Sequence, residues 1–223
     1  MKLINIKYNL DIELIENRVT IISVENPLVY REILENVWNQ IKGQEGDFIL
    51  SDGDKIKNIS KEVECIFNLF DTDFNNKKII SKLYQELNGQ SQILLQEETA
   101  KINYELIKYV EKLVMTVPYS IKYNVDMDVI SLLKMYNVEI SNASDSLLER
   151  IIEYIKVMNQ ICYIKTFIFV DLKHYLKIDE LHSLYEFVFY QKLNLLIVEP
   201  IHTSKLEEEK CFIIDKDLCI IDI

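Results

Sequence analysis

Asp171 stands where a catalytic metal ligand would stand, because it ends the apolar run FIFV at residues 167–170. A helical pattern follows, and then a second apolar run, NLLIVEP, at residues 194–200. P-loop proteins that hydrolyse nucleotides hold Mg²⁺ with an aspartate at the end of such a strand. An aspartate that caps a helix or occupies a turn is the alternative.

The phosphate loop that a P-loop enzyme needs is absent from this sequence. That loop, GxxxxGK[ST], joins the first buried strand to its helix. Here the junction is SVENPLVYRE, residues 23–32, without glycine or lysine. Pro27 removes an N–H donor and Glu25 would repel a phosphate. We therefore predict no bound nucleotide and no catalytic residue, and interpret Asp171 as a capping or turn residue.

The segment NVDMD, residues 124–128, is the most promising metal-ligand candidate. The side chains of Asn124, Asp126 and Asp128 alternate along an extended segment and can point the same way. Oxygen ligands of this kind suit Ca²⁺. A solvated acidic segment is the alternative, and it is our interpretation of the acid pairs elsewhere in the chain.

Other chemistries lack their residues. The sequence has no HExxH, GxSxG or EF-hand pattern. Its four cysteines form no CxxC pair and lie in apolar segments, which predicts buried free thiols. The histidines, His174, His182 and His202, are scattered. We interpret them as surface or hydrogen-bonded residues, not as ligands.

Charge argues against nucleic acid and anionic membrane as partners, because the net charge is −11 and the sequence pI is about 4.9. One modest group of lysines flanks residues 63–70; it consists of Lys55, Lys57, Lys61, Lys77 and Lys78. On sequence alone these lysines are solubilising surface residues. No apolar run approaches the length of a membrane span, and the N-terminal stretch has no apolar signal-peptide core, so we predict a cytoplasmic location.

The predicted elements form an α/β domain interrupted by helices. Apolar strands are predicted at 18–24, 63–70, 166–171 and 194–200, with further short strands near both ends of the chain, the last two at KCFII and DLCII. A hairpin is predicted at 47–56, with its turn at SDGD. Helices are predicted at 26–43, 75–88, 91–117, 128–137, 144–164 and 178–192, and Asn26 can cap the first of them, with Pro27 at its first helical position. We expect an α/β head domain of residues 1–90 and 166–223 with a mainly parallel sheet. Residues 91–165 are expected to form an inserted α-helical leg domain.

Several blocks together resemble one known family. They are VTIISVENP, DMDVISLLKMYNVEI, SDSLLERIIEYIKV, KTFIFVD and LNLLIVEP. In order and spacing they resemble the accessory adaptation protein of type II-A CRISPR systems, most closely over residues 119–200. The resemblance implies a head with a degenerate P-loop-like fold. It also implies a non-enzymatic homotetrameric ring that binds ends of linear double-stranded DNA without regard to sequence.

The resemblance further implies a role in antiviral defence, in which the ring supports spacer acquisition beside the CRISPR integrase subunits and the RNA-guided nuclease. It implies Ca²⁺ at a head–leg hinge, here IKYNVDMD at residues 121–128, with ligands among Asn124, Asp126 and Asp128. Lys122 and Asn124 make this hinge less acidic than the family pattern, which implies fewer or weaker ions, or none. Lysines at the inner wall of the ring would contact DNA, and by location we assign Lys55, Lys57, Lys77 and Lys78.

Two other functions stay open on sequence. One is a divergent P-loop NTPase or nuclease that uses Asp171 and nearby acids. The other is a purely structural protein-interaction module whose helical arm dimerises and which never contacts DNA.

Overall fold

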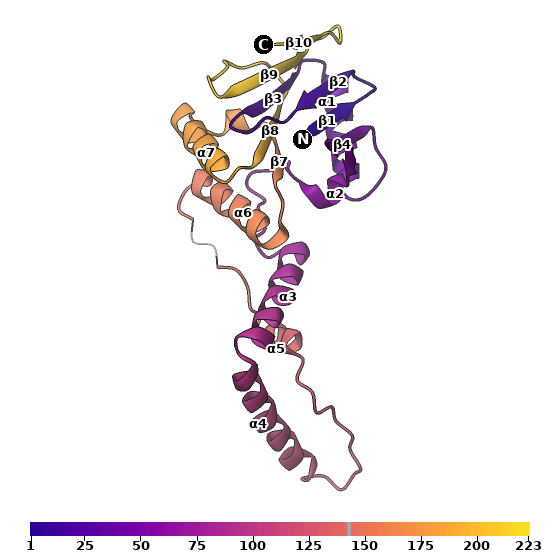
Figure 1. The fold of residues 1–223 in the computed structure, drawn as a ribbon, viewed down its shortest axis with the longest axis vertical. Helices are drawn as coiled ribbons and strands as arrows, with labels where there is room; N and C mark the ends of the chain where they lie inside the picture. Colours follow the sequence, from indigo (N-terminus) through magenta and orange to yellow (C-terminus); the bar gives the residue numbers. More distant parts are fainter. Residues whose placement is uncertain (142–143) are drawn as a thin grey trace. The chain divides into compact units, whose positions relative to one another are not determined.

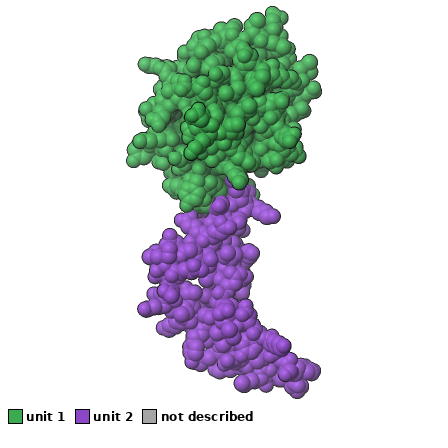
Figure 2. Space-filling model, turned by 45° about the vertical axis from the view of Figure 1, so that its right-hand side comes forward, with its two compact units in different colours: residues 1–73, 142–223 green, residues 74–141 purple. Residues whose placement is uncertain are grey.

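The computed structural model describes residues 1–141 and 144–223, which divide into two compact units. The first unit combines residues 1–73 with residues 142–223, and the second is the continuous stretch 74–141 (Figure 2). The second unit is thus an insertion between the two halves of the first.

The larger sheet of the first unit has the strand order β10-β9-β3-β8-β7-β6. Neighbouring strands are parallel except for β10, which is antiparallel to β9. Every residue of β3 and β7 is buried, which explains their nearly continuous apolar sequences. The predicted α/β class with a mainly parallel sheet is confirmed. The strands are β3 (Val19–Val24), β6 (Val63–Ile66), β7 (Thr166–Val170), β8 (Asn194–Glu199), β9 (Glu209–Ile214) and β10 (Ile220–Asp222).

A smaller antiparallel sheet has the order β2-β1-β4-β5. It consists of β1 (Lys2–Asn5), β2 (Leu10–Glu13), β4 (Phe48–Asp52) and β5 (Lys55–Lys57). The hairpin predicted at SDGD joins β4 to β5, and Gly53 adopts the positive φ of +58° that this tight turn requires. Apolar residues of this sheet belong to the same buried cluster as those of β3, β8 and β9.

Helices cover both faces of the larger sheet (Figure 1). On one side lies α1 (Pro27–Ile41), whose Val29, Ile33 and Val37 join the buried cluster, with the short α2 (Ile59–Glu62) beside it. On the other side lie α6 (Leu147–Cys162) and α7 (Ile178–Tyr190), which contact each other. A 3-10 turn, η1 (Leu172–His174), follows β7. The cap predicted for α1 is confirmed, because the Asn26 side chain accepts hydrogen bonds from the N–H groups of the first turn.

The second unit consists of α3 (Lys77–Ile93), α4 (Gln96–Val114) and α5 (Val129–Met135). Asn75 joins the two ends of this unit: its Oδ1 accepts from the Ile140 N–H at 2.8 Å and its Nδ2 donates to the Ile140 carbonyl at 3.1 Å. The helix α3 runs past the end predicted at residue 88 and reaches Ile93. The next helix, α4, therefore begins at Gln96 and not at residue 91. None of the helices in the described residues is long and apolar enough to cross a membrane.

The boundaries of the inserted unit differ from the expected 91–165. The helix predicted at 144–164 belongs to the first unit as α6, and α3 belongs to the second. Ile151, Ile155 and Met158 of α6 are buried, and the Tyr154 hydroxyl donates to Glu64 Oε1 of β6 at 2.8 Å. An amphipathic stripe shows that a helix packs against another element, but it does not show which element that is. Here the first unit supplies the partner.

The strand predicted at 63–70 is shorter than expected, because β6 ends at Ile66. Asn68 follows, and its side chain accepts a hydrogen bond from the Phe70 N–H at 3.0 Å. An asparagine that bonds to the backbone two residues on forms a turn, which competes with continuation of the strand.

Candidate functional site

The segment 124–128 joins α4 to α5 inside the second unit, and so it does not connect the two units. Asp128 is the N-cap of α5: its carboxylate accepts from the Ile130 and Ser131 N–H groups, each at 3.1 Å, and from the Ser131 hydroxyl. These hydrogen bonds, with the hydroxyl as the largest cause, hold the pKa of Asp128 below its usual value. Asn124 Oδ1 accepts from the Asp126 N–H at 3.2 Å.

These contacts bear on whether the segment fits Ca²⁺. The side chains of Asp128 and Asn124 already accept hydrogen bonds from backbone N–H groups. The Asp126 carboxylate is therefore the one most available to a metal ion. Within the described residues, no third acidic or histidine side chain joins them in a metal-sized group. Neutral oxygens are close, since Asp128 lines a polar hollow together with Ser91, Gln96 and Thr99. This donor set fits a weak calcium site.

The four lysines assigned to DNA lie on different units. Lys55 and Lys57 belong to β5 of the first unit, where Lys55 is exposed and Lys57 lies 4.0 Å from Glu62. Lys77 and Lys78 open α3 of the second unit and are exposed. Each pair is accessible in its own unit.

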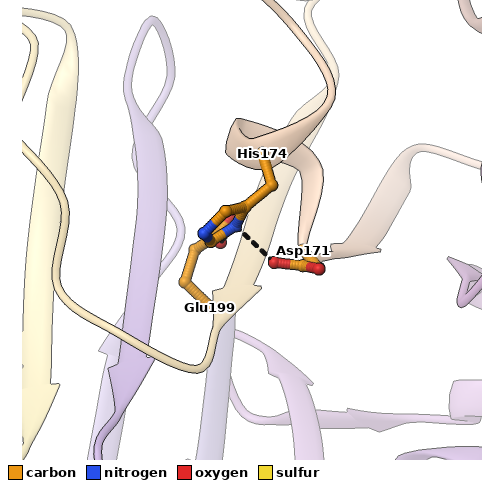
Figure 3. A group of neighbouring side chains, drawn as sticks. All are labelled: Asp171, His174 and Glu199. Atoms are coloured by element: carbon orange, nitrogen blue, oxygen red, sulfur yellow. Dashed lines mark ion pairs between the residues drawn. The ribbon is translucent and has the colours of Figure 1, made fainter.

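Asp171, His174 and Glu199 form a cluster that sequence reasoning missed (Figure 3). Asp171 follows β7 with a left-handed φ of +60°, which turns the chain into η1, and Glu199 ends β8. His174 Nδ1 lies 2.5 Å from Asp171 Oδ1 and 3.3 Å from Glu199 Oε2. The three residues therefore meet at the carboxyl edge of the parallel sheet, where ligands of α/β proteins commonly bind.

Burial dominates the electrostatics of this cluster. The Glu199 side chain is fully buried, which raises the pKa of its carboxyl; the Asp171 carboxylate raises it further, while the Lys173 N–H and His174 oppose the shift. The negative charges of this cluster also act on Tyr30 of α1. Its burial, together with the Asp171 and Glu199 carboxylates, raises its pKa to about 12. A cation at the cluster would relieve the repulsion between these acids.

The cysteines match the prediction only in part. All four are free thiols, and Cys211 is buried. Cys219 is exposed, because it lies in the turn between β9 and β10, where its N–H donates to Asp215 Oδ1 at 2.8 Å. The run DLCII, predicted as a final short strand, thus begins in an exposed turn before β10.

The helix α4 has an unburied apolar face. Ile102, Leu106, Tyr109 and Leu113 follow the 4-3-4 spacing of a coiled-coil seam, yet they are 43–64% exposed. No residue of α4 is buried in the single chain. A stripe of this kind is typical of a helix that packs against another protein chain.

A family model described as CRISPR-associated protein (Cas_Csn2) matches residues 40–218. The chain belongs to this family. The CRISPR-associated protein Csn2 of Streptococcus agalactiae is 24% identical in an alignment that covers 95% of this chain and 94% of that protein. The resemblance drawn from the apolar blocks is confirmed. The matched range contains the segment 124–128, the four lysines, α4 and the cluster at Asp171.

Proposed function

We propose that this chain binds the ends of linear double-stranded DNA, without regard to sequence, as a homotetrameric ring that supports spacer acquisition in a type II-A CRISPR system. Membership of the Csn2 family is the observation that carries the proposal. The integrase subunits and the RNA-guided nuclease are the partners it would assist.

Self-association is supported by α4. Its seam of Ile102, Leu106, Tyr109 and Leu113 stays 43–64% exposed in the part of the chain that the structure describes, and a second copy offers the same spacing. A ring would also reconcile DNA binding with the acidic composition of the chain. Lysines can line the inner wall while acids cover the outside, so a net charge of −11 is compatible with DNA inside.

The proposal includes no enzymatic activity. We propose that the head is a degenerate P-loop-like scaffold in which Asn26 replaces the phosphate. The Asn26 side chain accepts from the Leu28 and Val29 N–H groups at 3.1 and 3.4 Å. In a P-loop, N–H groups at this helix terminus would bind phosphate.

The protein should bind linear double-stranded DNA and should not bind covalently closed circular DNA. A gel-shift assay would compare one duplex sequence in linear and covalently closed circular form at low salt. Because a closed circle has no end to thread, we expect a stable complex with the linear form alone. Affinity for it should fall steeply as salt rises, since the contacts are to phosphates. Equal binding of both forms would contradict the ring.

Lysine variants would locate the contact in the same assay. Lys55→Glu with Lys57→Glu should weaken binding of the linear duplex while the oligomer survives. Lys165→Glu with Lys216→Glu changes the net charge equally at exposed positions and serves as the control. If neither the wild-type protein nor the variants bind DNA, the protein-interaction module is favoured. Nucleotide turnover that falls on Asp171→Ala would favour the enzyme.

We further propose that Ca²⁺ binds weakly at segment 124–128. With only Asp126 largely unengaged, we expect a dissociation constant on the order of 10⁻⁴–10⁻³ M. Calorimetric titration of the full chain with Ca²⁺ should show binding that Asp126→Asn removes. Asp128→Asn is the informative companion, because asparagine preserves the α5 cap while removing the charge. Binding that survives both substitutions would place Ca²⁺ elsewhere.

A further inference from the structure

The cluster of Asp171, His174 and Glu199 contains more acceptors than its one facing donor can satisfy. Asp171 Oδ1 and Glu199 Oε2 are both buried oxygens without a hydrogen-bond partner among the described residues. Both lie beside the same atom, His174 Nδ1, at 2.5 and 3.3 Å. An imidazole nitrogen carries at most one proton, so at least one carboxylate oxygen stays without a donor.

Glu199 makes this shortage costly. Its side chain is fully buried, and its Oε1 already accepts from the Lys173 N–H at 2.9 Å. Oε2 is left facing His174 and Asp171 (Figure 3). Ser23 of the neighbouring strand β3 pairs in register with Glu199, and its buried Oγ also has no hydrogen-bond partner in the described part of the chain. Buried polar atoms are normally paired, and one cation at this edge would satisfy these oxygens together.

We propose that Asp171, His174 and Glu199 bind one divalent first-row transition metal ion. Their candidate ligand atoms all lie within 4.8 Å of one another. Donor atoms about 2.0–2.2 Å from a metal lie roughly 2.8–3.6 Å apart at octahedral or tetrahedral angles. The distance from His174 Nδ1 to Glu199 Oε2 fits this range. Asp171 and His174 are partly exposed, at 35% and 47%, so they have room to separate from 2.5 Å.

The imidazole decides the class of metal. Ca²⁺ and Mg²⁺ take oxygen ligands, whereas imidazole with carboxylates suits Zn²⁺, Co²⁺ and Mn²⁺. The expected order of affinity is Zn²⁺ above Co²⁺ above Mn²⁺. Three protein ligands leave further coordination positions to water on the exposed side. The site is separate from the calcium segment in sequence and in unit, and it does not depend on the proposed DNA binding.

Titration of the full chain with Zn²⁺, followed by calorimetry, tests the site. We expect one Zn²⁺ per chain, with affinity that falls at least about tenfold in His174→Gln. Asp171→Asn should cause a similar loss without disturbing the backbone, because asparagine tolerates the left-handed conformation at this position. Co²⁺ gives a second readout, because the wild-type chain should show visible absorption bands that both variants should lack.

His182 provides the matched control. Its Nδ1 lies 2.9 Å from Glu208 Oε1 and its side chain is 40% exposed, so it forms a histidine–carboxylate pair that no third ligand joins within the described residues. His182→Gln should therefore leave Zn²⁺ affinity and the Co²⁺ bands unchanged. The proposal is overturned if His174→Gln and Asp171→Asn bind Zn²⁺ like the wild-type chain. It is overturned equally if His182→Gln loses as much affinity as His174→Gln.

Discussion

Leu106→Glu is expected to dissociate the proposed ring into smaller species. Leu106 lies in the middle of the exposed α4 seam, with Ile102 and Tyr109 on either side. If a second copy covers this seam, the glutamate is buried against apolar side chains without a partner. Burial of an unpaired charge costs several kcal/mol, which a modest helical interface does not offset. Sedimentation velocity at micromolar concentration would measure the change in mass.

Ala100→Glu is the control for this substitution. Ala100 is exposed on the same helix, and at 100° per residue it lies away from the seam. It adds the same charge and the same side chain, so only its position differs. The variant should remain assembled and should bind linear DNA, whereas Leu106→Glu should lose both properties. An unchanged mass for Leu106→Glu would show that α4 does not form the interface.

Lys173→Met is expected to destabilise the first unit strongly. The side chains of Lys173 and Glu209 are 6% and 0% exposed, and Lys173 Nζ lies 2.9 Å from Glu209 Oε2. Tyr185 donates its hydroxyl to Glu209 Oε1 at 2.7 Å, so burial and this carboxylate both raise the pKa of Tyr185. Without the lysine, the Glu209 charge is buried and uncompensated. Such a loss lowers the free energy of unfolding by about 3–5 kcal/mol. The midpoint of thermal unfolding, Tm, should therefore fall by about 6–20 °C.

Two further variants separate the buried charge from lost packing. Lys173→Met with Glu209→Met removes both charges and should recover much of the stability, because an apolar pair can replace a buried ion pair. Lys210→Met removes a more exposed partner, which lies 3.5 Å from Asp222, and should cost about 0–1 kcal/mol. A Lys173→Met protein that melts like the Lys210→Met protein would show that the buried pair contributes little.

Local signals in the sequence were sufficient for most elements. Pro27 after Asn26 predicted the start of α1, and Gly53 in SDGD predicted the turn between β4 and β5, because capping and turn geometry depend on residues within one turn. The parallel sheet followed from apolar runs buried on both faces. The family could also be identified from the order of these blocks along the chain.

The sequence by itself determined the class of fold, the missing phosphate loop and the family. Tertiary structure decided which partner each amphipathic helix packs against, and so it assigned α6 to the first unit and left the α4 seam uncovered. It also brought Glu199 to Asp171 and His174, because parallel pairing of β7 with β8 aligns strand ends that are separated in sequence by an entire helix. Neither the spacing of these residues nor the scatter of the histidines carries that information. Strand pairing is a long-range contact, whereas sequence patterns report local geometry.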